Sequence, residues 1–260
     1  MTTPTTNLQA VLFDLGETLL DTGSDTPDFE RDQAERDFRA AFDYLQGERI
    51  ATPPWTIFYP AMLGQLRQRR AQGFCTDCSV HIGDVMREVL LEMDIPLERV
   101  NLNTCVRLTF QYSVETARLY PQAIPALLAL RRRGLRLGLV SNTIWPGWCQ
   151  DEILELLGVR DLLEARVYSA DVEYAKPHPS IFRQALRILR VPPSAAVFVG
   201  DHLDPDVSGA HSAGMRAILL QVPYRREEKP GIVPDATIAS LDELPQALAA
   251  LDPPSAGEPA

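Results

Sequence analysis

From Tyr120 onwards, short apolar runs alternate with amphipathic segments, and this alternation constrains the fold more than any other feature of the chain. The apolar runs have the length and composition of buried strands, and they span residues 135–140, 165–169, 196–199, 217–221 and 237–239. Segments with helical periodicity separate them, and these span residues 124–133, 151–157, 179–189, 205–213 and 244–251. Strands joined by helices of this length form right-handed crossovers. The sequence therefore predicts a parallel sheet that is covered by helices on both faces.

The beginning of the chain adds one strand and then changes character. An apolar run that starts at Leu8 ends on Asp14 and breaks at Gly16, which predicts a buried strand that delivers Asp14 to a loop. Residues 22–118 show no convincing alternating pattern. Helices are expected there over residues 25–47, 58–72, 82–93 and 97–119.

The expected organisation is an α/β protein with a Rossmann-like, doubly wound parallel sheet and an inserted helical domain. Residues 1–21 and 119–251 form the expected core, and residues 22–118 form the insert. The tail, residues 252–260, is rich in Pro, Ala and Gly, and we expect it to be disordered.

Composition narrows the range of partners. A formal net charge of -10 argues against a broad surface for nucleic acid or anionic membranes, although a local site can still be positive. No apolar stretch approaches the ~20 residues of a membrane span, and the first residues lack the basic and apolar regions of a signal peptide. The 4 cysteines do not form a disulfide framework. We therefore expect a cytoplasmic protein, a monomer or homodimer, that binds neither nucleic acid nor membranes.

Polar side chains stand where the first four predicted strands end. Asp14 follows the first strand, Ser141 and Asn142 follow the second, and Lys176 lies beyond the third. The segment 200–206, with three aspartates, follows the fourth. Lysine is rare in this chain, which favours a specific role for Lys176. Ligands bind at the carboxyl ends of strands in open parallel sheets, so these residues predict a single site.

The order and types of these residues resemble the four motifs of the haloacid dehalogenase-like hydrolases. The likeness covers residues 8–21 and 120–250, and the helical insert lies where the family places its C1 cap. The resemblance implies a Mg²⁺-dependent phosphatase that acts on a small phosphorylated metabolite. Phosphoryl transfer of this kind needs an in-line nucleophile and compensation of the charge on the phosphoryl oxygens.

The resemblance also implies a role for each matching residue. Asp14 is expected to attack phosphorus and to form an aspartyl-phosphate. Asp14, Asp201 and the backbone carbonyl of Gly16 are expected to hold Mg²⁺, a cation that prefers oxygen ligands. Asp206 completes the expected metal set by orienting Lys176 or a metal-bound water.

The remaining expected site residues act on the phosphoryl oxygens. Lys176 and the Ser141 hydroxyl are expected to bind these oxygens directly, as catalytic residues. Asn142 and Thr18 complete the expected substrate-binding set, with Thr18 supporting the loop.

Gly16 departs from the family pattern. The first motif reads Asp-x-Asp-x-Thr, and its second Asp is the general acid/base, but this chain has Gly16 at that position. A proton donor of this kind is worth about 10²–10⁴ in rate. Glu17 and His202 are candidate replacements. Alternatively, the substrate has a leaving group that needs no proton, the protein is not a phosphatase, or it is inactive.

Two other functions stay open from the sequence. One is a haloacid dehalogenase-like hydrolase that forms an aspartyl ester without a metal, and the other is a catalytically weak protein that binds a phosphorylated ligand. The dehalogenases of the family lack the acidic segment that this chain carries at Asp201, Asp204 and Asp206. Carboxylates clustered opposite Asp14 without a cation would repel one another, so this segment favours Mg²⁺ and phosphoryl chemistry.

Two further patterns are weaker. Cys75, Cys78 and His81 have the spacing of half a zinc site, but no second Cys/His pair lies nearby, so cysteines of a cap loop are the favoured interpretation. Trp145 and Trp148 are candidates for flanking the site entrance, with local packing as the alternative.

Overall fold

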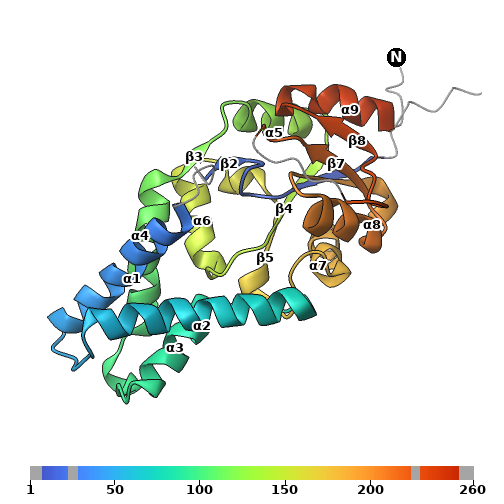
Figure 1. The fold of residues 1–260 in the computed structure, drawn as a ribbon. Coiled ribbons are helices and arrows are strands. Elements are labelled where there is room, and N and C mark those ends of the chain that lie inside the picture. The colour runs from blue at the N-terminus through green and yellow to red at the C-terminus, as the bar shows by residue number, and fades with distance from the viewer. Residues whose placement is uncertain (1–7, 23–28, 224–228, 252–260) are drawn as a thin grey trace, which may run out of the picture.

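The computed structural model describes residues 8–22, 29–223 and 229–251, with only the backbone described for residues 29–33 and 74–76. The expected disordered tail lies outside the described residues. A sheet with flanking helices forms one part of the molecule, and a group of helices lies to one side of it (Figure 1).

A parallel sheet of six strands forms the core, in the order β5-β4-β1-β6-β7-β8. The strands are β1 (Ala10–Phe13), β4 (Arg136–Ser141), β5 (Ala165–Tyr168), β6 (Ala196–Gly200), β7 (Arg216–Leu220) and β8 (Ala236–Ile238). Each neighbouring pair is parallel. The predicted α/β fold with a doubly wound parallel sheet is therefore confirmed.

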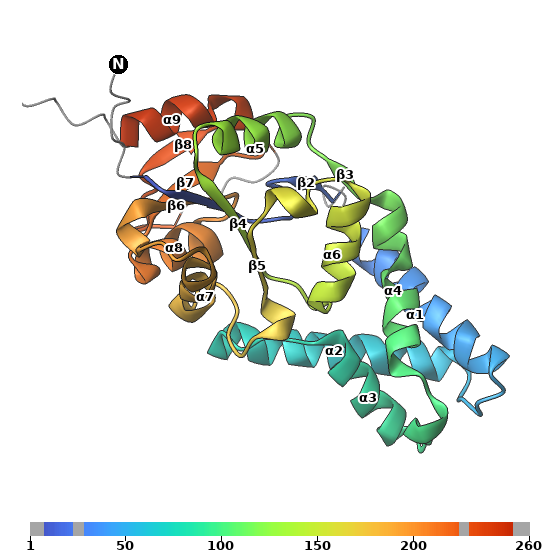
Figure 2. The ribbon, with the colours of Figure 1, turned by 180° about the vertical axis from the view of Figure 1, so that it is seen from behind.

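Helices cover both faces of this sheet, as the views from the front and from behind show (Figures 1 and 2). One face packs against α5 (Ala123–Arg132), α6 (Gly147–Leu156) and α9 (Leu244–Leu251). The other face packs against α7 (Pro179–Leu189) and α8 (Gly209–Ala213). The alternation of side chains along β1 explains this division, since Val11 and Phe13 join the first cluster and Leu12 the second.

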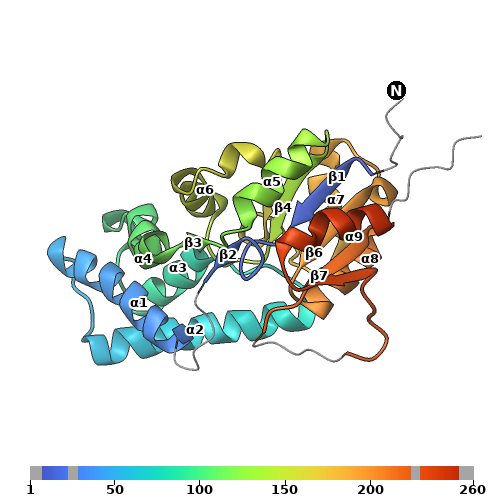
Figure 3. The same cartoon turned by 90° about the horizontal axis from the view of Figure 1, so that it is seen from above.

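In the sequence, four helices are inserted between two short strands, and in space they form the lateral part of the molecule (Figure 3). They are α1 (Phe29–Gly47), α2 (Trp55–Thr76), α3 (Ile82–Glu92) and α4 (Leu102–Thr116). We call these four helices the cap helices. Their apolar core includes Phe42, Trp55 and Phe58, and it is continuous with the apolar cluster on one face of the sheet. Among the described residues, no helix combines the length and the apolar character needed to cross a membrane.

The two strands that flank the cap helices were missed by the sequence analysis. β2 (Leu20–Asp21) pairs antiparallel with β3 (Arg118–Leu119) in a separate ladder. Strands of two residues are too short to show a period of two, and the partner lies about a hundred positions away in the chain. This ladder closes the base of the helical insertion.

The helix expected over residues 205–213 also differs from the structure. Residues Leu203–Ser208 form a π-helix, η5, which continues into α8. Single π turns inside helices often occur at functional sites. The shorter 3-10 turns are η1 (Leu97–Arg99), η2 (Arg160–Leu162), η3 (Ser169–Asp171), η4 (Pro193–Ala195) and η6 (Leu241–Glu243).

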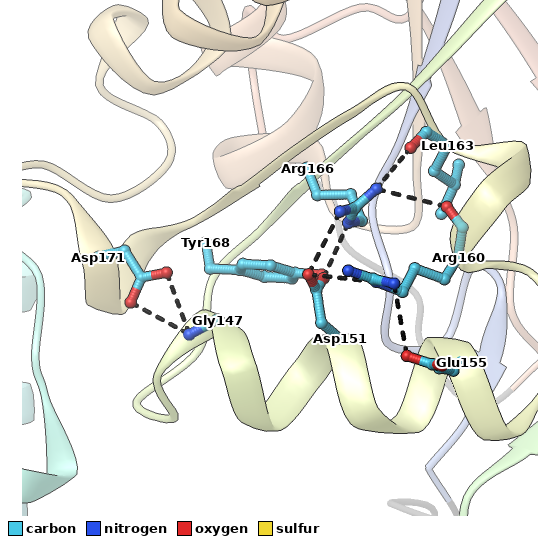
Figure 4. A network of polar contacts seen from close by, with 8 residues as sticks. All are labelled: Gly147, Asp151, Glu155, Arg160, Leu163, Arg166, Tyr168 and Asp171. Atoms are coloured by element: carbon cyan, nitrogen blue, oxygen red, sulfur yellow. Dashed lines mark hydrogen bonds and ion pairs between the residues drawn. The ribbon is translucent and has the colours of Figure 1, made fainter.

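A polar network joins α6 to β5 (Figure 4). Asp151 accepts hydrogen bonds from Arg166 Nε at 2.8 Å and from the Tyr168 hydroxyl at 2.7 Å. Asp171 accepts from the backbone N–H of Gly147 with both carboxylate oxygens, at 3.1 and 3.0 Å. These bonds fix the start of α6, and with it the loop that follows β4.

We expect Asp151→Asn to lower the free energy of unfolding by about 1–3 kcal/mol, because charged hydrogen bonds of Asp151 are lost. Burial alone would raise the pKa of Asp151, but hydrogen bonds from Arg166 and Tyr168 outweigh it and lower this pKa. The stabilisation is therefore present above the ordinary Asp pKa and is lost as the pH falls through the lowered value. Thermal melts at pH 7 and pH 3 should show a smaller difference between the variant and the unmodified protein at pH 3. Glu155→Gln, on the exposed side of α6, is the control and should change little.

Candidate active site

The loops of three strands meet at one edge of the sheet. Phe13, the last residue of β1, pairs with Leu139 of β4 and with Val199 of β6. Asp14 and the ends of β4 and β6 therefore leave the sheet side by side. The strand order changes direction at β1, since β4 lies on one side of it and β6 on the other. This switch point is where ligands bind in open parallel sheets.

Lys176 is buried between two carboxylates at this edge. Its Nζ donates to Asp14 Oδ1 at 2.6 Å and to Asp206 Oδ1 at 2.7 Å, and its side chain is 3% exposed. Burial alone would lower the pKa of Lys176, but the charges and hydrogen bonds of Asp14 and Asp206 raise it. The side chain therefore remains an ammonium group, which links two loops that lie far apart in the sequence.

Asp206 is held in place by the backbone around it. It lies in η5, and its Oδ2 accepts from the backbone N–H of His202 at 3.0 Å. Its carboxylate also packs directly against Gly200, where a Cβ would lie 2.4 Å from Asp206 Cγ. Only glycine allows this approach, so Gly200 is required for the position of Asp206.

The acidic residues form a group that could hold a metal. Asp14, Asp201 and Asp206 are buried, and each offers a carboxylate oxygen within 4.8 Å of the others. Lys176 supplies one positive charge to three carboxylates, so the group keeps an excess of negative charge. Oxygen ligands with excess negative charge fit a hard divalent cation. Thr18 donates from Oγ1 to Asp201 Oδ1 at 3.4 Å, so it contacts this group rather than the space in front of it.

Asn142 connects the loop after β4 to Lys176. Its Nδ2 donates to the backbone carbonyl of Lys176 at 2.9 Å, and its Oδ1 accepts from the backbone N–H of Lys176 at 2.8 Å. Both amide atoms are thus engaged in positioning Lys176. Ser141, at the end of β4, is buried and lines the adjacent cavity.

A cavity of about 520 Å³ lies between this edge and the cap helices. Its core side includes Leu15, Gly16, Ser141, Asn142, Thr143, Ile144, Trp145, Gln150 and Ile153. Its cap side includes Ala34, Asp37, Phe38, Leu63, Leu66, Arg67, Arg70, Ile82, Phe110, Ser113, Thr116 and Ala117. This volume lies in the range of small-molecule sites, and both apolar and polar side chains line it.

Three charged cap residues in the cavity wall were missed by the sequence analysis, namely Asp37 of α1 and Arg67 and Arg70 of α2. The position of Asp37 could have been found, because it lies three residues after Ala34 and four before Ala41, on the apolar face of its helix. The two arginines occupy exposed positions. Nothing in the sequence connects them to the site, because their place depends on how α2 packs.

Glu17 and His202, the two candidate replacements for the acid that is missing at Gly16, both lie outside the cavity wall in the described part of the chain. Glu17 is buried and accepts hydrogen bonds from the backbone N–H of Thr22 at 3.1 Å and from the Tyr120 hydroxyl at 2.7 Å. Of the residues that the structure describes, neither Glu17 nor His202 lines the cavity. Gly16 does line it, and a Cβ there would meet only Thr22 Cγ2, at an ordinary distance of 3.5 Å.

The half zinc site does not come together in the described residues. Cys78 is an exposed free thiol, and His81 accepts a hydrogen bond from the backbone N–H of Gly83 at 3.0 Å, which caps α3. The side chain of Cys75 lies outside the described residues. Within the described part of the chain, the cluster at Asp14 is the one group of potential metal ligands.

The cap helices are tied to the core beside the cavity. The backbone N–H of Ala175, next to Lys176, donates to the Asp77 carbonyl at the end of α2 at 2.7 Å. Arg107 of α4 forms an ion pair at 2.6 Å with Glu152 of α6, and its guanidinium lies over the ring of Trp148. Trp148 is therefore a surface contact, whereas Trp145 lines the cavity.

The fold and the site define an α/β protein with a buried carboxylate centre at the switch point of its sheet. The sequence pattern of the haloacid dehalogenase-like hydrolases matches residues 8–214, which is most of the chain. The chain belongs to this family of hydrolases. The resemblance seen in the sequence motifs is thereby confirmed.

The chain is similar in sequence to two phosphatases from other organisms. Glyceraldehyde 3-phosphate phosphatase of Methanopyrus kandleri is 38% identical over 128 residues, which cover 48% of this chain and 54% of the relative. Phosphoserine phosphatase of Thermus thermophilus is 38% identical over 126 residues, which cover 48% of this chain and 49% of the relative. The chain thus spans about half the length of these curated relatives.

Solved structures resemble the chain over nearly its whole length. A 2-haloacid dehalogenase from Pseudomonas syringae pv. Tomato DC3000 has a TM-score of 0.65 and 27% identity, covering 94% of this chain and 99% of the other. A HAD phosphatase from Thermococcus onnurineus has a TM-score of 0.61 and 26% identity, covering 93% and 98%. The similarity therefore extends to proteins named for two different reactions.

We expect Gly200→Ala to destabilise the protein by about 1–3 kcal/mol, because the added methyl overlaps Asp206 and must displace it. A thermal melt measures the effect. Gly64→Ala is the matched control, since a Cβ at this exposed position of α2 would meet nothing within 4 Å. This control should leave the stability unchanged or raise it slightly. Equal melting temperatures for the two variants would contradict the close packing of Asp206 on residue 200.

Proposed function

We propose that the protein is a Mg²⁺-dependent phosphatase that hydrolyses a small phosphorylated metabolite through an aspartyl-phosphate on Asp14. The observation that supports this most is the buried group of Asp14, Asp201, Asp206 and Lys176 beside the cavity. Two of the relatives are named as phosphatases of small metabolites.

The chain's own residues supply most of the chemistry. Asp14 is oriented by Lys176, so its other carboxylate oxygen can attack a phosphorus atom in line with the leaving group. The Lys176 ammonium and the Ser141 hydroxyl bind the phosphoryl oxygens and compensate their charge. Asn142 and Thr18 act one step away, Asn142 by holding the backbone of Lys176 and Thr18 by holding Asp201.

The metal would be held by Asp14, Asp201 and the Gly16 carbonyl, with Asp206 completing the group of oxygen ligands. When bound, Mg²⁺ supplies positive charge against the phosphoryl oxygens and the carboxylates. A glycine provides the backbone carbonyl as well as any other residue, so Gly16 is compatible with this role.

We further propose that residues 1–21 and 119–251 act as the catalytic core and residues 22–118 as a cap that selects the substrate. The cavity wall supports this division, because the core side carries Ser141 and Gly16 and the cap side carries Asp37 and the two arginines. The cavity volume of about 520 Å³ suits a small metabolite rather than a phosphoprotein.

A metal-independent dehalogenase is the second candidate, and the similarity to the Pseudomonas syringae enzyme favours it. The buried aspartate group counts against it, because Asp201 and Asp206 have no evident use in a reaction without a cation. Chloride release from 2-chloropropionate in the presence of EDTA distinguishes this candidate from a phosphatase.

We expect Asp14→Asn to reduce hydrolysis of p-nitrophenyl phosphate to the background rate, because an amide oxygen is a poor nucleophile. The unmodified protein should hydrolyse this compound with Mg²⁺ and lose the activity in EDTA. Release of p-nitrophenolate is followed by absorbance. Asp204→Asn is the matched control, since Asp204 pairs with Lys229 on the surface and should retain activity. Unchanged turnover in Asp14→Asn, or activity that persists in EDTA, would overturn the proposed mechanism.

A further inference from the structure

The absence of an acid at Gly16 leaves the leaving group without a proton donor from the first loop. Gly16 faces the cavity with room for a side chain, so the shape of the loop does not exclude an acid there. Glu17, the adjacent carboxyl, is bound by Thr22 and Tyr120. A donor for this cavity must therefore come from another element.

Asp37 on α1 lines the same cavity as Gly16. The residue is 4% exposed, and its Oδ1 has no hydrogen-bond partner among the described residues. A buried polar atom without a partner is rare, because its desolvation is not compensated. A buried carboxyl oxygen without a partner, in the wall of a substrate-sized cavity, points to a contact that is made only when substrate is bound.

The surroundings of Asp37 favour its neutral form. Burial raises the pKa of Asp37 to about 8, and the charge of Arg36 on the same helix only partly opposes this. From the elements packed against α1, α2 contributes Arg67 and Arg70 to the cavity wall, and both are solvent-exposed.

The other elements around this part of the cavity add little positive charge. β2 contributes the carboxylate of Asp21, and α4 contributes the uncharged Ser113 and Thr116. At neutral pH Asp37 therefore carries a proton that it can donate.

We propose that Asp37 is the catalytic acid that protonates the leaving group, in place of the acid missing at Gly16. The inference rests on the proposed phosphatase function. In this proposal the leaving group of the substrate lies beside α1. The cap then contributes a proton donor to the reaction, in addition to selecting the substrate.

The proposed step is balanced in atoms and charge. An oxygen of Asp14 forms a bond to phosphorus while the bond from phosphorus to the leaving oxygen breaks, and the electron pair of that bond goes to the leaving oxygen. The proton of Asp37 moves to this oxygen, so a neutral alcohol leaves and Asp37 becomes a carboxylate. Water then attacks phosphorus and displaces Asp14, while Asp37 takes a proton from the water and is restored.

The test compares leaving groups of different basicity. The probes are p-nitrophenyl phosphate, phenyl phosphate and glycerol 3-phosphate, with Mg²⁺ present, and the measured quantity is kcat/KM, which reports the steps through loss of the leaving group. In Asp37→Asn, we expect kcat/KM to fall about 10²–10⁴-fold for phenyl phosphate and glycerol 3-phosphate. For p-nitrophenyl phosphate, whose leaving group needs no proton, the change should stay within about threefold.

Two further measurements separate acid catalysis from a structural role. Gly16→Asp combined with Asp37→Asn should recover part of the lost activity, because the new carboxyl lies in the same cavity. In the unmodified protein, kcat/KM for phenyl phosphate should fall as the pH rises through about 8, and this fall should disappear in Asp37→Asn. Asp43→Asn, on the exposed side of α1, is the control and should keep the full activity and pH profile.

Specific outcomes overturn the inference. An equal loss for all three probes in Asp37→Asn, or a change in KM alone, would show that Asp37 binds substrate or supports the fold. A fall in melting temperature together with an equal loss would assign the effect to folding. If the unmodified protein hydrolyses none of the probes, the proposed phosphatase function fails instead, so the two failures are distinguishable.

Discussion

The rest of the site depends on the buried ion pairs that the Lys176 ammonium forms with two carboxylates. This ammonium brings together Asp14, which follows the central strand, and Asp206, which lies in the π-helix. Each carboxylate is nearly inaccessible to water and would repel the other without this charge. Asn142 secures the backbone of Lys176, so the loops after β1, β4, β5 and β6 become one rigid unit. The excess negative charge that remains makes this unit suited to a divalent cation.

The cap helices complete the site from the other side. They form one wall of the cavity and bring Asp37, Arg67 and Arg70 to it. The core contributes the buried aspartates and Lys176 beside the cavity, and the cap contributes charged side chains to the opposite wall. The chain resembles both a phosphatase and a dehalogenase in structure, and one fold can serve several reactions when the residues around its site change.

Much of the core could be predicted from the sequence, because strand and helix periods are local properties of the chain. The helix predicted over residues 179–189 matches α7 residue for residue, since Pro179 starts it and its apolar positions repeat every three to four residues. The ladder between β2 and β3 and the π-helix at residues 203–208 were not predictable in this way. The first is too short to show a period, and the second departs from the α-helical period of 3.6 residues that a sequence pattern can show.

The sequence by itself determined the fold class and which polar residues follow the strands of the sheet. Residues at the ends of parallel strands must gather at one edge of the sheet, so Asp14, Ser141 and Asp201 could be grouped without a structure. Only the tertiary structure decided that Asn142 and Thr18 position other residues, that Glu17 is engaged away from the cavity, and that Asp37 lines it. The physical reason is that these outcomes depend on which side chains meet when segments distant in the sequence come together in the fold. A local sequence pattern carries no information on such contacts.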